Sequence, residues 1–201
     1  MHLVCLDLEG VLVPEIWIAF SEATGIPELK ITTRDEPDYD KLMKFRIGIL
    51  RDKGLGLADI RRVIGAMDPL PGAREFVGAL RERTQFIILS DTFTQFAAPL
   101  MAKLGYPTLF CNTLTVDASG AIVGYELRQK DGKRKSVEAL KSLNFRIFAG
   151  GDSFNDLSMI RAADAGSLFR APASIRAQCS DLPCVDDYGA FLERIDAFLA
   201  S

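Results

Sequence analysis

The stretch Leu3-Val4-Cys5-Leu6-Asp7-Leu8-Glu9-Gly10-Val11 decides the fold class of this chain. Its first four residues form an uninterrupted apolar run, which is typical of a strand buried on both faces of a parallel sheet. Two carboxylates, Asp7 and Glu9, follow the run, and Gly10 then allows the backbone to turn. Because ligands bind beyond the carboxyl ends of the strands in open parallel sheets, this strand end is the first candidate functional position.

Further apolar runs of strand length recur along the chain, and helical periodicity lies between most of them. The runs are Phe86–Leu89, Arg146–Ala149, Gly166–Phe169 and the weaker Pro183–Val185. This alternation predicts an α/β fold with a doubly wound, mostly parallel sheet of the Rossmann type. Two alternating stretches within Thr113–Arg128 flank Asp117-Ala118-Ser119-Gly120 and predict a β-hairpin.

The segment between the first two strands is too long for a single crossover connection. Pro14 suits the first position of a helix, and apolar residues then recur at helical spacing up to Met67. The turn Asp68-Pro69-Leu70-Pro71-Gly72 closes the segment. We therefore expect a small helical cap, residues 14–68, inserted into a core domain made of residues 1–13 and 69–201.

The composition excludes several classes of protein. The chain has 201 residues, of which 48% are hydrophobic and 25% charged, as in ordinary globular domains. A net charge of −3 lacks the basic excess of proteins that bind nucleic acid or anionic membranes. No apolar run is long enough to span a membrane, and the first residues lack the pattern of a secretory signal. Neither nucleic acid nor a membrane is therefore expected as a partner.

The cysteines and the histidine narrow the chemistry. None of the cysteines forms a C-x-x-C pair, and they are interpreted as reduced thiols of a cytoplasmic protein: Cys5, Cys111, Cys179 and Cys184. The single histidine is His2, at the start of the sequence. Catalysis by histidine and histidine-rich metal sites are therefore excluded.

Acidic residues follow two of the predicted strands, and a serine follows a third. The run ending at Ala149 continues as Gly150-Gly151-Asp152-Ser153-Phe154-Asn155-Asp156, and the run ending at Leu89 continues as Ser90-Asp91. Singly, each acid has a structural explanation: a solvated loop residue, a helix N-cap, or a charge favourable to a helix dipole. Gathered at one edge, however, Asp7, Glu9, Asp152 and Asp156 would repel one another unless a hard cation such as Mg²⁺ bound there. The pattern favours phosphoryl chemistry.

These motifs resemble those of the haloacid-dehalogenase-like hydrolase superfamily. Its first motif, four apolar residues followed by D-x-D-x-[TV], is matched at residues 3–11, with Glu9 in place of the second Asp. Its second motif, an apolar strand ending in Ser or Thr, is matched by Ile87–Ser90, and G-D-x-x-x-D by Gly151–Asp156. The form G-D-S-x-N-D is most similar to the phosphoserine phosphatases, including those that also pass phosphate to homoserine.

The resemblance implies a role for each acid. Asp7 would be the nucleophile that forms an aspartyl-phosphate, and it would ligate Mg²⁺ together with Asp152 and the backbone carbonyl of Glu9. Asp156 would act through a metal-bound water. Glu9 would protonate the leaving oxygen of O-phosphoserine and then activate the attacking water or alcohol. Its extra methylene, compared with Asp, leads to the hypothesis that homoserine competes with water as acceptor.

The resemblance also requires a lysine at a helix start, for which Lys130, Lys133 and Lys135 are candidates. Lys133 is chosen because Val137 and Leu140 follow it on one helix face. A cation there would hold the phosphate beside Ser90 and balance Asp7. The alternative interpretation is a solvated basic cluster.

The family also points to residues that would recognise the substrate. Arg46 interrupts an apolar helix stripe, so it either meets the substrate carboxylate or extends to solvent. Glu15 either pairs with the substrate ammonium or favours a helix dipole. Asp91 and Asn155 would contact the substrate. Three apolar residues are read as core or as shields of the site: Trp17, Phe20 and Met43.

Three other functions fit part of the pattern. A phosphoreceiver signalling module also has a phosphorylated Asp, a Ser or Thr and a Lys on a doubly wound sheet. Two features argue against it: the reactive Asp follows the first strand, and a helical insertion comes directly after that strand. Another small-molecule phosphatase of the same superfamily would share all the motifs. A dehalogenase of the superfamily would need no metal.

Overall fold

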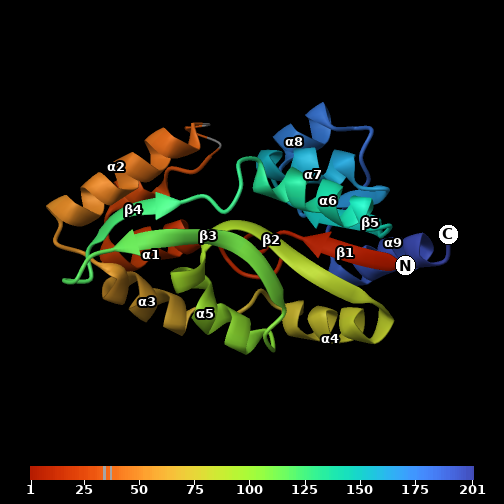
Figure 1. Ribbon diagram of the computed structural model, residues 1–201, viewed down its shortest axis with the longest axis horizontal. Coiled ribbons are helices and arrows are strands. Elements are labelled where there is room, and N and C mark those ends of the chain that lie inside the picture. The colour runs from red at the N-terminus through yellow and green to blue at the C-terminus, as the bar shows by residue number, and fades with distance from the viewer. Residues whose placement is uncertain (34, 37) are drawn as a thin grey trace.

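In the computed structural model, which describes residues 1–33, 35–36 and 38–201, a sheet runs through the molecule (Figure 1). Its strands are β1 (His2–Leu6), β2 (Gln85–Phe93), β3 (Thr108–Val116), β4 (Ile122–Glu126), β5 (Arg146–Gly151), β6 (Ala165–Phe169) and β7 (Cys184–Val185). Their order is β4-β3-β2-β1-β5-β6-β7, and neighbours are parallel except for the antiparallel pair β3 and β4. The predicted mostly parallel α/β sheet is therefore confirmed.

Helices cover both faces of this sheet. They are α1 (Ile16–Thr24), η1 (Pro27–Lys30), α2 (Tyr39–Asp52), α3 (Leu57–Ala66), α4 (Ala73–Arg83), α5 (Thr94–Lys103), α6 (Gly132–Ser142), η2 (Phe154–Asp156), α7 (Leu157–Ala162), α8 (Ala173–Gln178) and α9 (Tyr188–Leu199). Residues of β1 alternate between two apolar clusters, as strand geometry requires. Val4 and Leu6 join the cluster that contains α4 and α9, whereas Leu3 and Cys5 join the one under α6, α7 and α8.

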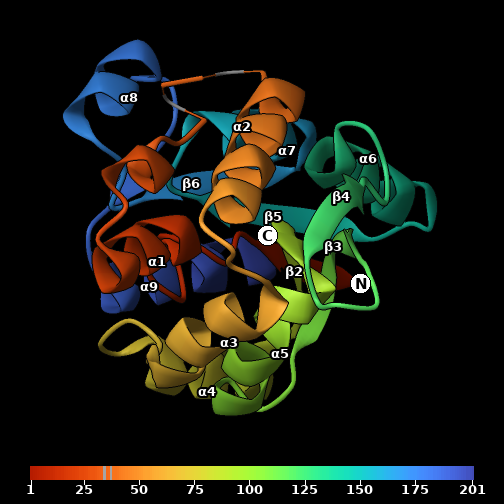
Figure 2. The same cartoon turned by 90° about the vertical axis from the view of Figure 1, so that its left-hand side faces the viewer.

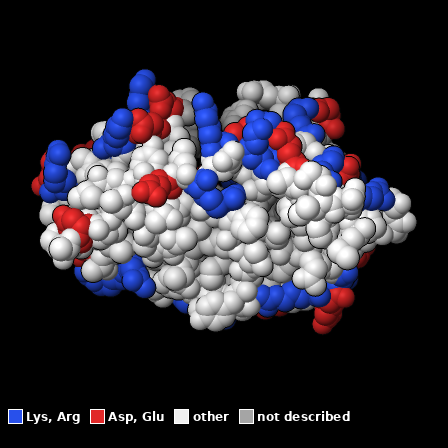
Figure 3. Space-filling model, viewed as in Figure 1, with Lys and Arg blue, Asp and Glu red and all other residues white. Residues whose placement is uncertain are grey.

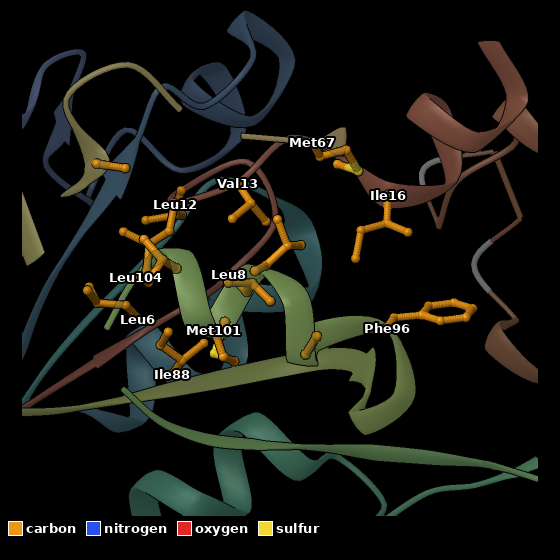
Figure 4. Close-up of a cluster of buried hydrophobic side chains, with 14 of the residues drawn as sticks. Leu6, Leu8, Leu12, Val13, Ile16, Met67, Ile88, Phe96, Met101 and Leu104 are labelled. Atoms are coloured by element: carbon orange, nitrogen blue, oxygen red, sulfur yellow. The ribbon is translucent and has the colours of Figure 1, made fainter. Parts of the chain in front are cut away.

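The helices of residues 14–68 gather at one end of the molecule, beside the carboxyl ends of β1 and β2 (Figures 1 and 2). Their apolar side chains belong to the same buried cluster as those of the sheet. Ile16 and Met67 lie in this cluster with Leu8 of the loop after β1 and Phe96 of α5 (Figure 4). The apolar interior therefore continues from the sheet into the inserted helices. Residues 34 and 37 of the predicted cap lie outside the described residues.

One local prediction was wrong, and two strands extend beyond the segments expected for them. The first inserted helix begins at Ile16, with Glu15 as an extended N-cap residue, so Pro14 is not its first residue. The reason is that the Glu9 carboxylate accepts the Ile16 N–H at 2.8 Å and fixes the first helical amide there. The hairpin within Thr113–Arg128 is confirmed, since β3 pairs with β4 from Thr113 onward. However, β3 already begins at Thr108, where its first half pairs with β2, and β2 runs past Leu89 to Phe93.

The surface agrees with the balanced composition. On the face shown in Figure 3, basic and acidic side chains are intermixed and form no broad patch of one sign. All four cysteines are free thiols, as predicted. Among the described residues, no helix combines the length and the apolar character that crossing a bilayer requires.

Candidate active site

The sheet register brings three predicted strand ends to one place. Leu6 of β1 lies between Ile88 of β2 and Gly150 of β5, and the Asp7 N–H donates to the Gly150 carbonyl at 2.9 Å. The residues at and after these strand ends line one cavity, together with residues of the insertion and Lys133 of α6. They are Asp7, Glu9, Glu15, Trp17, Thr32, Thr33, Tyr39, Arg46, Ser90, Asp91, Thr92, Phe93, Lys133, Ser153 and Asn155. The cavity therefore lies where parallel sheets place their ligands.

A buried lysine lies at the centre of the acidic residues. The Nζ of Lys133, in the first turn of α6, is 2.9 Å from Asp7 Oδ1 and 2.6 Å from Asp156 Oδ1. Burial alone would lower the pKa of Lys133, but the charges of Asp156 and Asp7 raise it well above its usual value. Lys130 and Lys135 are exposed, so among the three candidates only Lys133 reaches the site.

Three buried carboxylates form a group suited to a metal ion. One oxygen each from Asp7, Asp152 and Asp156 lies within 4.8 Å of the others. Two glycines make this approach possible: a Cβ on Gly10, whose φ is +77°, would overlap the Asp152 carboxylate, and a Cβ on Gly151 would overlap Asp156. Among the described residues, this is the acidic group compact enough to hold a cation.

The charge balance of this group also fits a divalent cation. Lys133 offers one positive charge against three buried carboxylates. Burial and the nearby Asp156 charge raise the pKa of Asp7 well above its usual value, although Lys133 opposes them. Both Asp156 oxygens already accept hydrogen bonds, one from Lys133 and the other from the backbone amides of Asp152 and Ser153. An oxygen-rich site with excess negative charge is the kind that Mg²⁺ prefers.

The Glu9 carboxylate lies apart from this metal-type group. It does not accompany Asp7, because β1 ends at Leu6 and the chain bends at Leu8, and the Glu9 side chain reaches the N-terminus of α1. Burial and the nearby Glu15 charge raise the pKa of Glu9 to about 7, opposed by the Ile16 N–H and Arg46. The metal contact predicted for its backbone carbonyl stays a prediction.

Arg46 is buried within the insertion, so the interpretation that it extends to solvent was wrong. The residue is 6% exposed. Its guanidinium carbon lies 4.5 Å from the centre of the Trp17 ring, and its Nη2 donates to the Ile31 carbonyl at 2.7 Å. Burial lowers its pKa to about 10. Within the described chain, its Nε is a buried donor with no hydrogen-bond partner. A buried cation with an unused donor beside a cavity is suited to an anionic group.

The remaining predicted residues also lie around the cavity. Glu15 lines it from the N-cap position of α1 and makes no side-chain capping bond. Its place at the N-terminus of α1 also keeps the helix-dipole interpretation open. Asn155 Nδ2 donates to Asp91 Oδ2 at 2.8 Å, and Ser90 Oγ accepts from the Thr92 N–H at 3.2 Å. Of the three apolar candidates, Trp17 lines the cavity, while Phe20 and Met43 are buried in the core.

Two further residues lie at this edge and were not predicted from the sequence. Tyr39, whose ring fits the helical apolar spacing of the insertion, donates its hydroxyl to the Asp91 carbonyl at 2.9 Å. Asn112, which precedes the predicted hairpin, donates to the same carbonyl at 3.1 Å. The signal that could have drawn attention to Tyr39 is its hydroxyl, which needs a partner when the ring is turned inward.

Comparisons with known proteins agree with this geometry. A family model described as haloacid dehalogenase-like hydrolase matches residues 1–164. A Pseudomonas aeruginosa protein named phosphoserine phosphatase ThrH is 58% identical over 94% of this chain and 92% of its own length. A Pseudomonas syringae pv. tomato phosphoserine phosphatase is 57% identical over 94% of this chain and 79% of its own.

Solved structures show the same fold. The crystal structure of phosphoserine phosphatase from T. onnurineus matches with a TM-score of 0.73 at 23% identity, covering 98% of this chain and 94% of that one. A structure described as a phospho-aspartyl intermediate analogue of phosphoserine phosphatase matches with a TM-score of 0.76 at 20% identity, covering 92% and 93%. With the family match spanning most of its length, the chain belongs to the haloacid dehalogenase-like hydrolase family.

Proposed function

We propose that this chain is a Mg²⁺-dependent phosphoserine phosphatase that also transfers phosphate to homoserine, through an aspartyl-phosphate on Asp7. The observation that carries the proposal is Lys133 Nζ, held between Asp7 and Asp156 at 2.9 and 2.6 Å, in a cavity that also contains a buried arginine. The names of the two Pseudomonas relatives support phosphoserine as the substrate. The free cysteines suit action in the reducing cytoplasm.

Asp7, Asp152 and the backbone carbonyl of Glu9 would hold the Mg²⁺, with Asp156 acting through water. The compact group of buried carboxylates and its excess negative charge support this assignment. When bound, the ion would neutralise charge on the phosphoryl oxygens and on Asp7. Lys133 and the Ser90 hydroxyl would hold the remaining phosphoryl oxygens.

The reaction would then proceed in two displacements. An Asp7 oxygen attacks phosphorus and the bond between phosphorus and the serine oxygen breaks, while Glu9 gives its proton to that oxygen. In the second step, Glu9 takes a proton from water or an alcohol, which attacks phosphorus and releases Asp7. A pKa of about 7 suits a group that must first donate and then accept a proton near neutral pH.

Residues of the insertion would recognise the amino-acid part of the substrate. Arg46, with its unpartnered Nε, would bind the carboxylate, and Glu15 would bind the ammonium. Asp91 and Asn155, already hydrogen-bonded to each other, would contact the substrate at the cavity wall. In this proposal residues 14–68 act as a cap, and Trp17 shields the reacting groups from water.

Homoserine as acceptor follows from the longer side chain at position 9. Glu9 Oε2 accepts the Ile16 N–H at the N-terminus of α1 at 2.8 Å. The other carboxylate oxygen, which remains for catalysis, is therefore placed from the cap side of the cavity. We expect this placement to favour an alcohol over a small water molecule. Glu9→Asp should raise the ratio of hydrolysis to transfer, and an unchanged ratio would contradict this part of the proposal.

Product analysis with phosphoserine, Mg²⁺ and added homoserine tests the whole proposal. We expect free phosphate together with phosphohomoserine, and no turnover after chelation or in Asp7→Asn. Formation of a stable phosphoprotein without turnover would point instead to a receiver module. Turnover of a haloacid that survives chelation would point to a dehalogenase, and hydrolysis confined to other phosphate esters would point to a different phosphatase.

A further inference from the structure

Strand β2 leaves the regular sheet ladder at the edge of the cavity. It pairs with β3 through Leu89 and Phe110 and again through Phe93 and Asn112, with an irregularity between these pairs. Residues 90–92 of β2 therefore stand opposite a single residue of β3. Such a bulge removes backbone groups from the ladder, so the Asp91 carbonyl needs partners from elsewhere.

Two side chains supply those partners. Tyr39, the first residue of α2, donates to the Asp91 carbonyl at 2.9 Å, and the Nδ2 of Asn112 donates to it at 3.1 Å. Asn112 is itself fixed, because it is 5% exposed and its Oδ1 accepts the Arg128 N–H at 3.1 Å. One carbonyl is therefore held from the insertion and from the sheet at the same time.

Holding this carbonyl also fixes the direction of an N–H group. The Asp91 carbonyl and the Thr92 N–H belong to one planar trans peptide unit, in which they point in opposite directions. The carbonyl points to Tyr39 and Asn112, and the N–H donates to Ser90 Oγ at 3.2 Å. Rotation of the peptide would break three hydrogen bonds at once, so the Thr92 N–H stays directed to the Ser90 side of the cavity.

We propose that Tyr39 and Asn112 are positioning residues: by fixing the Asp91–Thr92 peptide they keep the Thr92 N–H on Ser90 Oγ and so direct the Ser90 hydroxyl at the phosphoryl group. This inference rests on the proposed function, since it assigns the Ser90 side of the cavity to phosphate. A hydroxyl donor directed in advance at developing charge stabilises the transition state more than the ground state. Because Tyr39 belongs to α2, the peptide is fully fixed only while α2 lies against the end of β2. The helix that carries Arg46 is thereby coupled to a phosphate donor.

Tyr125 of β4 provides a matched control. Its hydroxyl donates to Asp40 Oδ1 at 2.8 Å, so it also joins α2 to the sheet by one tyrosine hydroxyl. The rings of Tyr39 and Tyr125 pack edge to face with their centres 5.7 Å apart. Tyr125→Phe therefore removes a comparable hydrogen bond in the same neighbourhood without releasing the Asp91 carbonyl.

The test compares Tyr39→Phe, Tyr125→Phe and the unaltered protein, all with Mg²⁺. In Tyr39→Phe we expect kcat for phosphoserine to fall about tenfold while KM changes little, which corresponds to one hydrogen bond lost from the transition state. The dissociation constant of orthovanadate, a mimic of the transferring phosphoryl group, should rise about tenfold. It can be followed by the fluorescence of Trp17, the single tryptophan, which lines the cavity. Tyr125→Phe should stay within about twofold in both measurements.

Asn112→Asp supplies a second variant of nearly unchanged shape, in which a donor to the carbonyl becomes a repelling acceptor. It should weaken orthovanadate binding at least as much as Tyr39→Phe. Equal effects of Tyr39→Phe and Tyr125→Phe, or normal orthovanadate binding in Tyr39→Phe and Asn112→Asp, would overturn the inference. If the unaltered protein does not turn over phosphoserine but the orthovanadate differences persist, the proposed function fails and the positioning role stands.

Discussion

Replacement of Lys133 by Met should destabilise the metal-free protein strongly. The variant leaves Asp7 and Asp156 buried without their shared cation, whose Nζ lies 2.9 and 2.6 Å from them. The three side chains are 5%, 7% and 0% exposed, so water cannot replace the lost partner. Breaking a buried ion pair costs about 3–5 kcal/mol. For a chain of this size each kcal/mol lowers Tm by about 2–4 °C, so we expect a fall of about 6–20 °C.

Calorimetry or circular dichroism of the chelated protein measures this change. Lys135→Met is the control, because Lys135 pairs with Glu138 at 3.3 Å on the surface, where solvent screens the pair, and its Tm should barely move. Adding Asp156→Asn to Lys133→Met removes one of the orphaned charges and should restore part of the stability. Added Mg²⁺ should stabilise the single variant by binding its native state. A Tm for Lys133→Met equal to that of Lys135→Met would refute the reasoning.

Three further changes test other parts of the site and fold. Gly10→Ala should lose more stability and more Mg²⁺ affinity than Gly25→Ala. Both glycines have a positive φ, but only at Gly10 would a Cβ overlap a carboxylate. Thermal melts and Mg²⁺ titrations of the two variants measure the difference. Arg46→Met should raise the KM for phosphoserine about 10- to 100-fold. The KM for phosphoethanolamine, which lacks the carboxylate, should stay nearly unchanged. If steady-state kinetics show that both KM values rise alike, the assignment of Arg46 is contradicted. Asp164 accepts the Ile147 N–H at 2.7 Å and, although burial opposes it, this bond and a lysine lower its pKa. Its contribution is fully present above pH about 4 and is lost as the pH falls through the lowered pKa, so Asp164→Asn should cost about 1 kcal/mol at pH 7 and progressively less below pH about 4 in urea melts.

The sequence predicted the elements whose pattern is local. The apolar run before Asp7 and the run before Asp152 became neighbouring strands, and the alternating stretches around Asp117 became a hairpin. The strand ends then had to meet, because parallel strands bring their carboxyl ends to one edge. Lys133 could be chosen among three lysines because helical periodicity distinguishes the inward face of α6 from the outward one.

The contacts that the sequence did not predict are those between distant segments. Periodicity indicated that one face of α2 is buried, but not what this face packs against. For this reason neither the hydrogen bond from Tyr39 to the Asp91 carbonyl nor the burial of Arg46 against Trp17 could be predicted. Nor does an apolar run show where a ladder is interrupted, and the irregularity in β2 made Asn112 a partner of Asp91. Each of these contacts depends on tertiary packing rather than on local propensity.

The apolar cluster shared by the sheet and residues 14–68 has a consequence for how the molecule comes apart. Ile60 and Ile64 of α3 are buried against the same group as Leu100 and Met101 of α5, so these helices lose their packing when the sheet does. Neither half can melt alone without exposing hydrocarbon to water. Heating should therefore produce one cooperative transition, with equal calorimetric and van't Hoff enthalpies, and a chain from which the inserted helices are excised should not fold.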